Sequence, residues 1–152
     1  MKTIFCIRHG RAAHNVLSDK IGEKAFLLKE SFDPPLVEEG ILQAKELGEN
    51  SKQLQKIDVV FVSPLTRTLQ TAEKIFEKKE VKIIAIEKMK EFPQGVEICN
   101  KRRNRIVLKE KFRKIDFSLL DSDLDQMWRE DRYEKIEELK ERIEEFKKFL
   151  LN

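Results

Sequence analysis

The alternation of short strand-like runs with longer helix-like segments constrains the fold of this chain most. Three apolar runs rich in β-branched residues, Lys2–Ile7, Ile57–Val62 and Val81–Ile86, are bounded by charged or turn-forming residues, as buried strands of a parallel sheet are. Residues 38–55 and 66–78 carry apolar side chains at helical spacing. This order of strands and helices predicts an α/β fold with a mostly parallel sheet.

The length of 152 residues allows one compact domain, which we assign to residues 1–152. Hydrophobic residues make up 40% of the chain and charged residues 39%, so a core can form inside a heavily charged surface, and this composition argues against intrinsic disorder. A further amphipathic helix is predicted from Tyr133 onward. Its apolar positions are Ile136, Leu139, Ile143, Phe146 and Leu150.

Charge and cysteine content narrow the possible partners and the compartment. The net charge of +3 is too small to require nucleic acid or an anionic membrane as a partner. Residues 99–115 are strongly basic and residues 116–138 strongly acidic, so we expect these blocks to neutralise each other. Cys6 and Cys99 lie far apart, and no secretory signal is visible, which predicts a reduced, cytoplasmic protein. We predict no metal and no cofactor, and leave the oligomeric state open.

Two basic motifs follow the first two predicted strands directly. Arg8-His9-Gly10 ends the first strand, and Ser63-Pro64 ends the second and opens a helix whose first turn holds Arg67. A histidine at a strand end is, by itself, more often a loop cap than a catalytic group. Because the carboxyl ends of parallel strands form the ligand-binding edge of such sheets, we expect the side chains of Arg8, His9 and Arg67 to meet there.

This arrangement indicates phosphoryl-transfer chemistry. The two guanidinium groups and the start of a helix create a positive potential, which lowers the pKa of His9 and keeps its imidazole nucleophilic. The same groups offer forked donors to a phosphoryl group. A neutral histidine that attacks phosphorus forms a phosphohistidine, which water then hydrolyses. Glu91, just after the third predicted strand, is the candidate acid for the leaving alcohol.

Two motifs together resemble the histidine phosphatase superfamily, with its phosphoglycerate-mutase-like fold. They are RHGRAAHN at 8–15 and SPLTRTLQTA at 63–72. Leu36, Gly40, Gln43 and Ala44 look like the helix that joins these motifs in the family. Residues 91–103 and 116–128 are similar to the plant and protist branch. The resemblance implies a three-layer αβα domain that acts on a small phosphorylated substrate.

By this resemblance, His9 is the phosphoacceptor, Arg8 and Arg67 are phosphate ligands, Asn15 is a further phosphate contact and Glu91 is the proton donor. One departure is Val37, which stands where the family commonly has serine or threonine. Valine cannot cap the following helix through a hydroxyl group, a loss of about 1 kcal/mol.

A second basic group, Arg102 and Arg103, is a candidate for binding the remainder of an anionic substrate. A run of positive charge is more often a solvated face balanced by nearby acids. For these two arginines we therefore favour a solvated, charge-balanced face over substrate contact.

A larger departure concerns the second active-site histidine of the family, which lies on a strand after the long C-terminal helix. This sequence ends at Asn152 and contains only His9 and His14. If the family topology holds, lack of that strand leaves backbone N–H and C=O groups unpaired and exposes apolar surface beside Ile4–Ile7. The second histidine would donate a hydrogen bond to the phosphoryl group in the transition state. In other enzymes, loss of one such donor lowers the rate on the order of 10²–10³-fold.

Three functions therefore stay open at this point. The first is a phosphatase working through His9, with its catalysis impaired by truncation at the C-terminus. The second is mutase-type transfer to a phosphoglycerate, for which the sequence carries no positive sign. The third is a shortened, non-catalytic protein that retains phospholigand binding. We favour the phosphatase, because His9, both arginines and Glu91 are all present.

Overall fold

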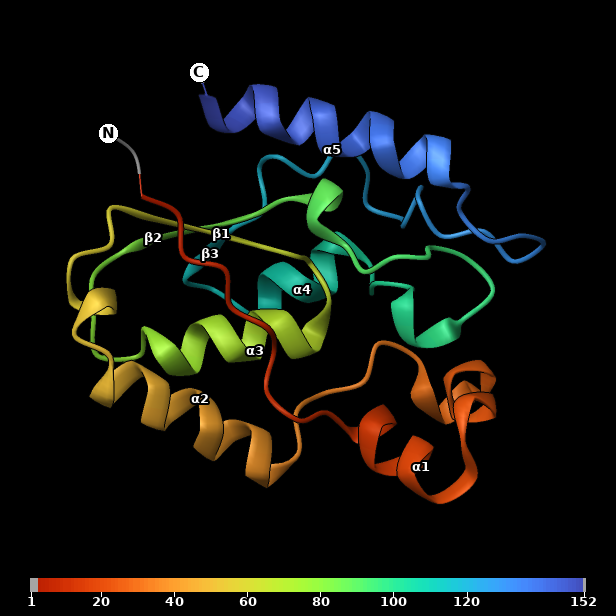
Figure 1. The fold of residues 1–152 in the computed structure, drawn as a ribbon, viewed down its shortest axis with the longest axis horizontal. Helices are drawn as coiled ribbons and strands as arrows, with labels where there is room; N and C mark the ends of the chain where they lie inside the picture. The colour runs from red at the N-terminus through yellow and green to blue at the C-terminus, as the bar shows by residue number, and fades with distance from the viewer. Residues whose placement is uncertain (1–2, 152) are drawn as a thin grey trace.

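A three-stranded parallel sheet with helices on both sides forms the centre of the computed structural model, which describes residues 3–151 (Figure 1). The strands are β1 (Val59–Val62), β2 (Lys82–Ala85) and β3 (Ile115–Asp116), in the order β1-β2-β3. Val59 pairs with Lys82, and Ile83 pairs with Ile115.

The sheet separates two helical layers. Helices α2 (Glu38–Asn50) and α3 (Thr66–Ile75) lie on one side, and α5 (Ile136–Leu151) crosses the other (Figure 1). Strand β1 contacts both layers, because successive side chains of a strand point to opposite faces. Val62 belongs to the core on the α3 side, whereas the ring of Phe61 lies 5.3 Å from that of Phe149 in α5. The predicted three-layer α/β fold is confirmed.

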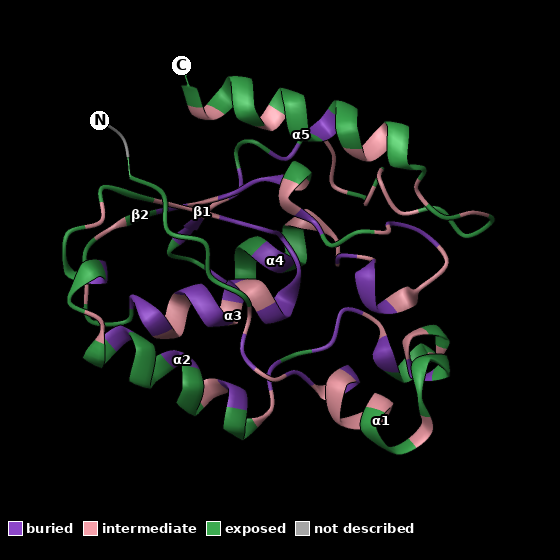
Figure 2. Cartoon of the chain, in the orientation of Figure 1, coloured by how far each residue is buried: buried purple, intermediate pink, exposed green. Residues whose placement is uncertain are grey.

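The main apolar core lies between the sheet and the layer that contains α2 and α3. Its buried members are Ala44, Leu54, Val62, Leu69, Ala72, Ile75, Phe76, Ile83, Ala85, Leu108, Phe112, Ile115, Phe117 and Leu120. Helix α3 is accordingly buried along most of its length (Figure 2). This burial fixes the position of α3, which carries Arg67 in its first turn.

Most predicted elements are present, with shorter bounds. The runs at 57–62 and 81–86 are β1 and β2, and the segments 38–55 and 66–78 hold α2 and α3. The α-helices α1 (Ala13–Ile21) and α4 (Arg105–Lys111) and the two-residue strand β3 were not predicted, and neither were the short 3-10 helices. Helix α2 begins after Val37 without a side-chain cap, as expected.

The prediction of a strand at Lys2–Ile7 is wrong for the described residues; Lys2 lies outside them. The backbone from Thr3 to Arg11 has no strand assignment. β1 is an edge strand of the described sheet, and the segment before Ala12 does not pair with it. The apolar side chains of this segment are therefore not enclosed between strands and helices. Ile4, Phe5 and Ile7 are accordingly 65%, 46% and 41% exposed (Figure 2).

The basic and acidic blocks of the later sequence contact each other, as predicted. Nε of Arg105 lies 2.8 Å from Oδ1 of Asp123. A buried ion pair of 2.5 Å joins Lys90, after β2, to Asp125 in the acidic block. Within residues 3–151, no helix combines the length and the apolar character needed to cross a membrane.

Candidate active site

A glycine contact fixes the loop that carries His9 against α2. The backbone of Gly10 packs directly on that of Gly40, and a Cβ atom at Gly40 would overlap the backbone of Arg11. The amide of Gly10 also donates to Oγ1 of Thr71 in α3, at 3.0 Å. These contacts hold the loop rigidly, so the orientation of His9 is set by α2 and α3.

The imidazole of His9 is held in one tautomer. Its Nδ1 atom lies 2.7 Å from the carbonyl oxygen of Gly10. Since a carbonyl oxygen only accepts, Nδ1 carries the proton and donates it, which leaves the lone pair on Nε2. Nε2 is therefore the atom of His9 able to attack an electrophile.

The surroundings of His9 favour its neutral form. Burial lowers the pKa of the imidazole, and the charges of Arg67 and Arg8 lower it further. The hydrogen bond to the Gly10 carbonyl and the charge of Glu91 act in the opposite direction. The charges of Arg67, Arg8 and Glu91 therefore all act on His9, and the joint role of these residues in one phosphate site stays a prediction.

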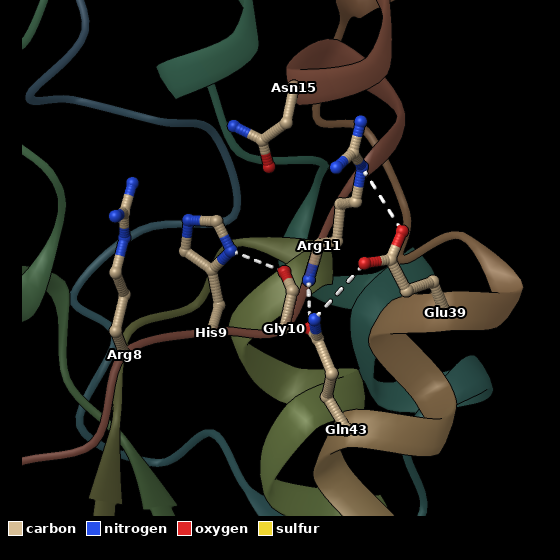
Figure 3. A pocket seen from close by; sticks show the side chains of 7 residues that line it. All are labelled: Arg8, His9, Gly10, Arg11, Asn15, Glu39 and Gln43. Carbon is tan, nitrogen blue, oxygen red and sulfur yellow. Dashed lines mark hydrogen bonds and ion pairs between the residues drawn. The ribbon is translucent and has the colours of Figure 1, made fainter.

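An open pocket of about 290 Å³ lies beside His9 (Figure 3). Its lining is mainly polar and consists of Arg8, His9, Gly10, Arg11, Asn15, Glu39 and Gln43. The side chains of Arg8 and His9 project in the same direction from the loop, and the amide of Asn15 faces the same space from the start of α1 (Figure 3). Arg8, His9 and Asn15 therefore share one pocket, whereas Arg67 and Glu91 are not among its lining residues.

Arg67 is a buried cation. It is 1% exposed; Nη1 donates to the carbonyl of Cys99 at 2.7 Å, and Nη2 donates to Oδ1 of Asn100 at 2.9 Å. Nε of Arg67 has no hydrogen-bond partner within residues 3–151. Burial lowers the pKa of this guanidinium, while Glu91 and Asp33 raise it. A buried charge compensated so incompletely favours the approach of an anion.

Glu91 faces the same cation from the loop after β2. Its Oε2 atom lies 4.0 Å from Nη2 of Arg67, and its side chain is 51% exposed. The carboxylate is thus open to solvent and to ligands, although it stands beside a buried charge. The role of Glu91 as proton donor stays a prediction.

A carboxylate distant in sequence supports the start of α3. Asp33 is fully buried and accepts from the amide of Thr66 at 2.8 Å and from its hydroxyl at 2.7 Å. Burial raises the pKa of Asp33, whereas both bonds to Thr66 lower it. This capping fixes the turn of α3 that holds Arg67.

Sequence reasoning did not identify His14 as a buried neighbour of Asn15 and His9. The amide of Ala12 donates to Oδ1 of Asn15, so Nδ2 of Asn15 faces and donates to Nε2 of His14 at 3.3 Å. The rings of His9 and His14 are 5.9 Å apart. Burial, followed by the charge of Arg67, lowers the pKa of His14 to about 3. The position of His14 inside the RHGRAAHN motif was the feature of the sequence that could have indicated this contact.

Arg11 is a second pocket residue that sequence reasoning did not single out. Its amide donates to Oε1 of Gln43 at 2.9 Å, and its guanidinium pairs with Asp19 and with Glu39. Arg11 therefore joins the His9 loop to α1 and α2, and its charge is compensated by two carboxylates. Its position directly after Gly10 was the feature of the sequence that could have indicated that Arg11 lies at the pocket.

The prediction for Arg102 is corrected by its surroundings. This residue is 2% exposed, and its guanidinium donates to the carboxylate of Glu87. Its remaining N–H groups donate to the backbone carbonyls of Ser122, Asp123, Leu124 and Arg103. With all its donors used inside the fold, Arg102 stabilises the loops around it and has none left for a substrate.

Arg103 differs from its neighbour in exposure. Its side chain is 38% exposed, Nε lies 3.7 Å from Oδ2 of Asp33, and the guanidinium stacks over the ring of Phe32 at 5.0 Å. Substrate contact at Arg103 stays a prediction.

Comparison with known proteins places this site in a family. Residues 4–151 match the model of the histidine phosphatase superfamily (branch 1). The chain belongs to this superfamily. Phosphoglycerate mutase-like protein 1 of Arabidopsis thaliana is 32% identical over 180 residues, covering 98% of the chain and 63% of that relative. The family predicted from the two motifs is confirmed.

Two further matches extend the comparison to a bacterial protein and to a solved structure. Phosphoserine phosphatase 1 of Hydrogenobacter thermophilus is 32% identical over 96 residues, which cover 63% of this chain and 41% of that protein. The solved structure of ecdysone phosphate phosphatase from Bombix mori aligns with a TM-score of 0.53 and 18% identity, covering 89% of this chain and 61% of that one. This second likeness shows the shared fold. The chain thus spans less than two thirds of the length of these relatives.

Proposed function

We propose that this chain binds a phosphomonoester of a small molecule and transfers the phosphoryl group to Nε2 of His9. The observation that carries the proposal is the state of the imidazole. Nδ1 is committed to the carbonyl of Gly10, and burial together with Arg67 and Arg8 lowers the pKa of His9. A neutral ring with its lone pair on a known atom is the form that attacks phosphorus.

The guanidinium groups supply the binding energy for the phosphoryl group. Arg67 carries a buried charge on a guanidinium oriented by Cys99 and Asn100, and Arg8 adds an exposed cation beside His9. Both charges act on the trigonal phosphoryl oxygens as negative charge redistributes during transfer. The orientation of Arg67 before the substrate arrives lowers the cost of reorganisation in the transition state.

In the first step, the Nε2–phosphorus bond forms as the bond between phosphorus and the ester oxygen breaks. The carboxyl group of Glu91 gives its proton to the leaving alcohol oxygen. In the second step, a water oxygen attacks phosphorus, the nitrogen–phosphorus bond breaks, and the Glu91 carboxylate takes the proton of that water. The products are the alcohol and inorganic phosphate, and both catalytic groups return to their initial states.

The main competing function is phospholigand binding without turnover. It is favoured by one observation: Nη1 and Nη2 of Arg67 already donate to protein acceptors, so this residue offers a substrate fewer free donors than an open guanidinium does. Mutase-type transfer differs only in the second step, where a phosphoglycerate hydroxyl replaces water.

One set of assays distinguishes these functions. We expect the chain to release 4-nitrophenol from 4-nitrophenyl phosphate, the His9→Ala variant to lose this activity, and orthovanadate to raise the Tm of the parent. Vanadate binding with no turnover in the parent would establish the binding function instead. Turnover that rises only when 3-phosphoglycerate is added as acceptor would favour the mutase. Equal turnover by the parent and His9→Ala contradicts the role of His9.

A further inference from the structure

The loop that carries Glu91 is held by α5 through one buried arginine. Arg142 lies near the middle of α5, is 9% exposed, and donates from Nη1 to the carbonyls of Lys88 and Lys90, both at 2.9 Å. The carbonyl of Lys90 belongs to the peptide group that links Lys90 to Glu91. Arg142 therefore acts on the backbone directly before the candidate acid.

A second residue holds Arg142 itself in place. Glu134 accepts from Nε of Arg142 at 2.6 Å and from Nη2 at 2.7 Å, a bidentate pair between two largely buried side chains. Such a fork fixes the plane of the guanidinium, which a single contact does not. Nη1 is consequently directed at the two carbonyls of the Glu91 loop.

The same carboxylate also fixes the far side of the loop. The amide of Gln94 donates to Oε2 of Glu134 at 3.2 Å, and the amide of Glu134 donates to the carbonyl of Gln94 at 2.7 Å. The side-chain amide of Gln94 donates to the carbonyl of Glu91. The backbone is thus held on both sides of Glu91, while the Glu91 carboxylate is half exposed beside Arg67.

We propose that Arg142, oriented by Glu134, is a positioning residue that holds Glu91 in place to protonate the leaving alcohol. This inference rests on the proposed function, in which Glu91 is the acid. A long side chain on an unsupported loop samples many positions, and small displacements of a proton donor reduce its contribution strongly. The clamp from α5 removes this freedom from the backbone and leaves the carboxylate accessible.

The chain offers a matched control for this clamp. Lys88 also joins the Glu91 loop to α5, through an exposed ion pair of 2.5 Å with Glu145. That pair uses the side chain of Lys88 and makes no contact with the backbone at Lys90. Lys88→Met therefore removes a cation between the same two elements without touching the proposed positioning contacts.

The test compares phenyl phosphate with 4-nitrophenyl phosphate, two esters of similar shape. 4-Nitrophenol is the more acidic alcohol and leaves readily without a proton, whereas phenol needs the acid more. We expect Arg142→Met to lower kcat/KM for phenyl phosphate about tenfold more than for 4-nitrophenyl phosphate, within the 10²–10⁴ that a general acid contributes. Arg142→Lys restores part of this difference, and Lys88→Met shows none.

Each outcome bears on a different claim. Equal losses for both esters in Arg142→Met would assign Arg142 a merely structural role and overturn the inference. If Glu91→Gln itself shows no dependence on the leaving alcohol, the assignment of the acid in the proposed function fails first. A readout without turnover is amide hydrogen exchange, which we expect to accelerate at residues 89–95 in Arg142→Met but not in Lys88→Met. Unchanged exchange there overturns the inference even if the chain has no phosphatase activity.

Discussion

Nη2 of Arg67 lies 4.0 Å from Oε2 of Glu91, which joins the first turn of α3 to the loop after β2. The two residues come from different strand–helix connections, and they meet because parallel strands end at one edge of the sheet. A buried cation and a half-exposed carboxylate thus stand together near His9, whose pKa both of them influence.

The pKa of His9 depends on Arg8, and removing that charge is expected to raise it. In the parent, burial and the two arginines hold the pKa below the ordinary value of 6.5, so the ring is neutral at neutral pH. In Arg8→Met, we expect the NMR titration midpoint of His9, and the acid limb of kcat/KM with it, to move upward. Arg11→Met is the control, because Arg11 lines the same pocket but pairs with Asp19 and Glu39. An unchanged midpoint in Arg8→Met contradicts the electrostatic account.

Gly40→Ala is expected to destabilise the protein and to impair the site at once. The added Cβ overlaps the backbone of Arg11, so the His9 loop or α2 must shift. Overpacking of this kind costs about 1–3 kcal/mol of unfolding free energy, measurable by urea denaturation. Vanadate binding should weaken in parallel. Glu46→Ala, at an exposed position of the same helix, should change stability by no more than about 0.5 kcal/mol.

His14 makes the stability of the fold depend on pH. Its pKa is about 3 in the folded protein against 6.5 as the ordinary value, so the unfolded chain binds the additional proton between these two pH values. Stability is therefore full above pH 6.5 and falls as the pH drops toward 3, by up to about 1.4 kcal/mol per pH unit. Urea titrations at several pH values should show a shallower decline for His14→Phe. Parallel curves for parent and variant would count against this role of His14.

Lys90→Met tests the buried ion pair next to the candidate acid. The Nζ atom of Lys90 and the carboxylate of Asp125 are both inaccessible to solvent and lie 2.5 Å apart. Removing one partner leaves the other charge buried, which typically costs about 3–5 kcal/mol. Lys88→Met breaks an exposed pair and should cost at most about 1 kcal/mol. Similar losses of unfolding free energy in Lys90→Met and Lys88→Met would show that burial of the Lys90–Asp125 pair does not increase the cost of removing one partner.

Local sequence signals predicted much of the fold and of the candidate site. Short apolar runs located β1 and β2, and apolar side chains at helical spacing located α2 and α3, because each of these elements buries a face against its neighbours. The strand-end rule placed Arg67 and Glu91, which follow β1 and β2, at one edge of the sheet. It does not account for His9, because the segment before His9 is not a strand of the described sheet. These inferences needed no knowledge of contacts between distant segments.

Pairings between distant residues could not be predicted in this way. The capping of α3 by Asp33 and the clamp from Arg142 to Lys90 join residues 33 and 52 positions apart, and no periodicity marks them. The segment Ile4–Ile7 has strand-like composition but no strand assignment, because a strand requires a partner that composition cannot supply. Arg102 was misjudged for the same reason, as its acceptors lie mostly 20 to 22 residues away.

The most direct test of the account is to trap and map the phosphoenzyme. The parent is incubated with a ³²P-labelled phosphomonoester, quenched in alkali, digested and analysed by mass spectrometry. We predict one phosphorylated peptide, with an alkali-stable and acid-labile phosphoryl group on His9, and its absence from His9→Ala. A label found on another residue, or retained in His9→Ala, would contradict the central claim that Nε2 of His9 accepts the phosphoryl group.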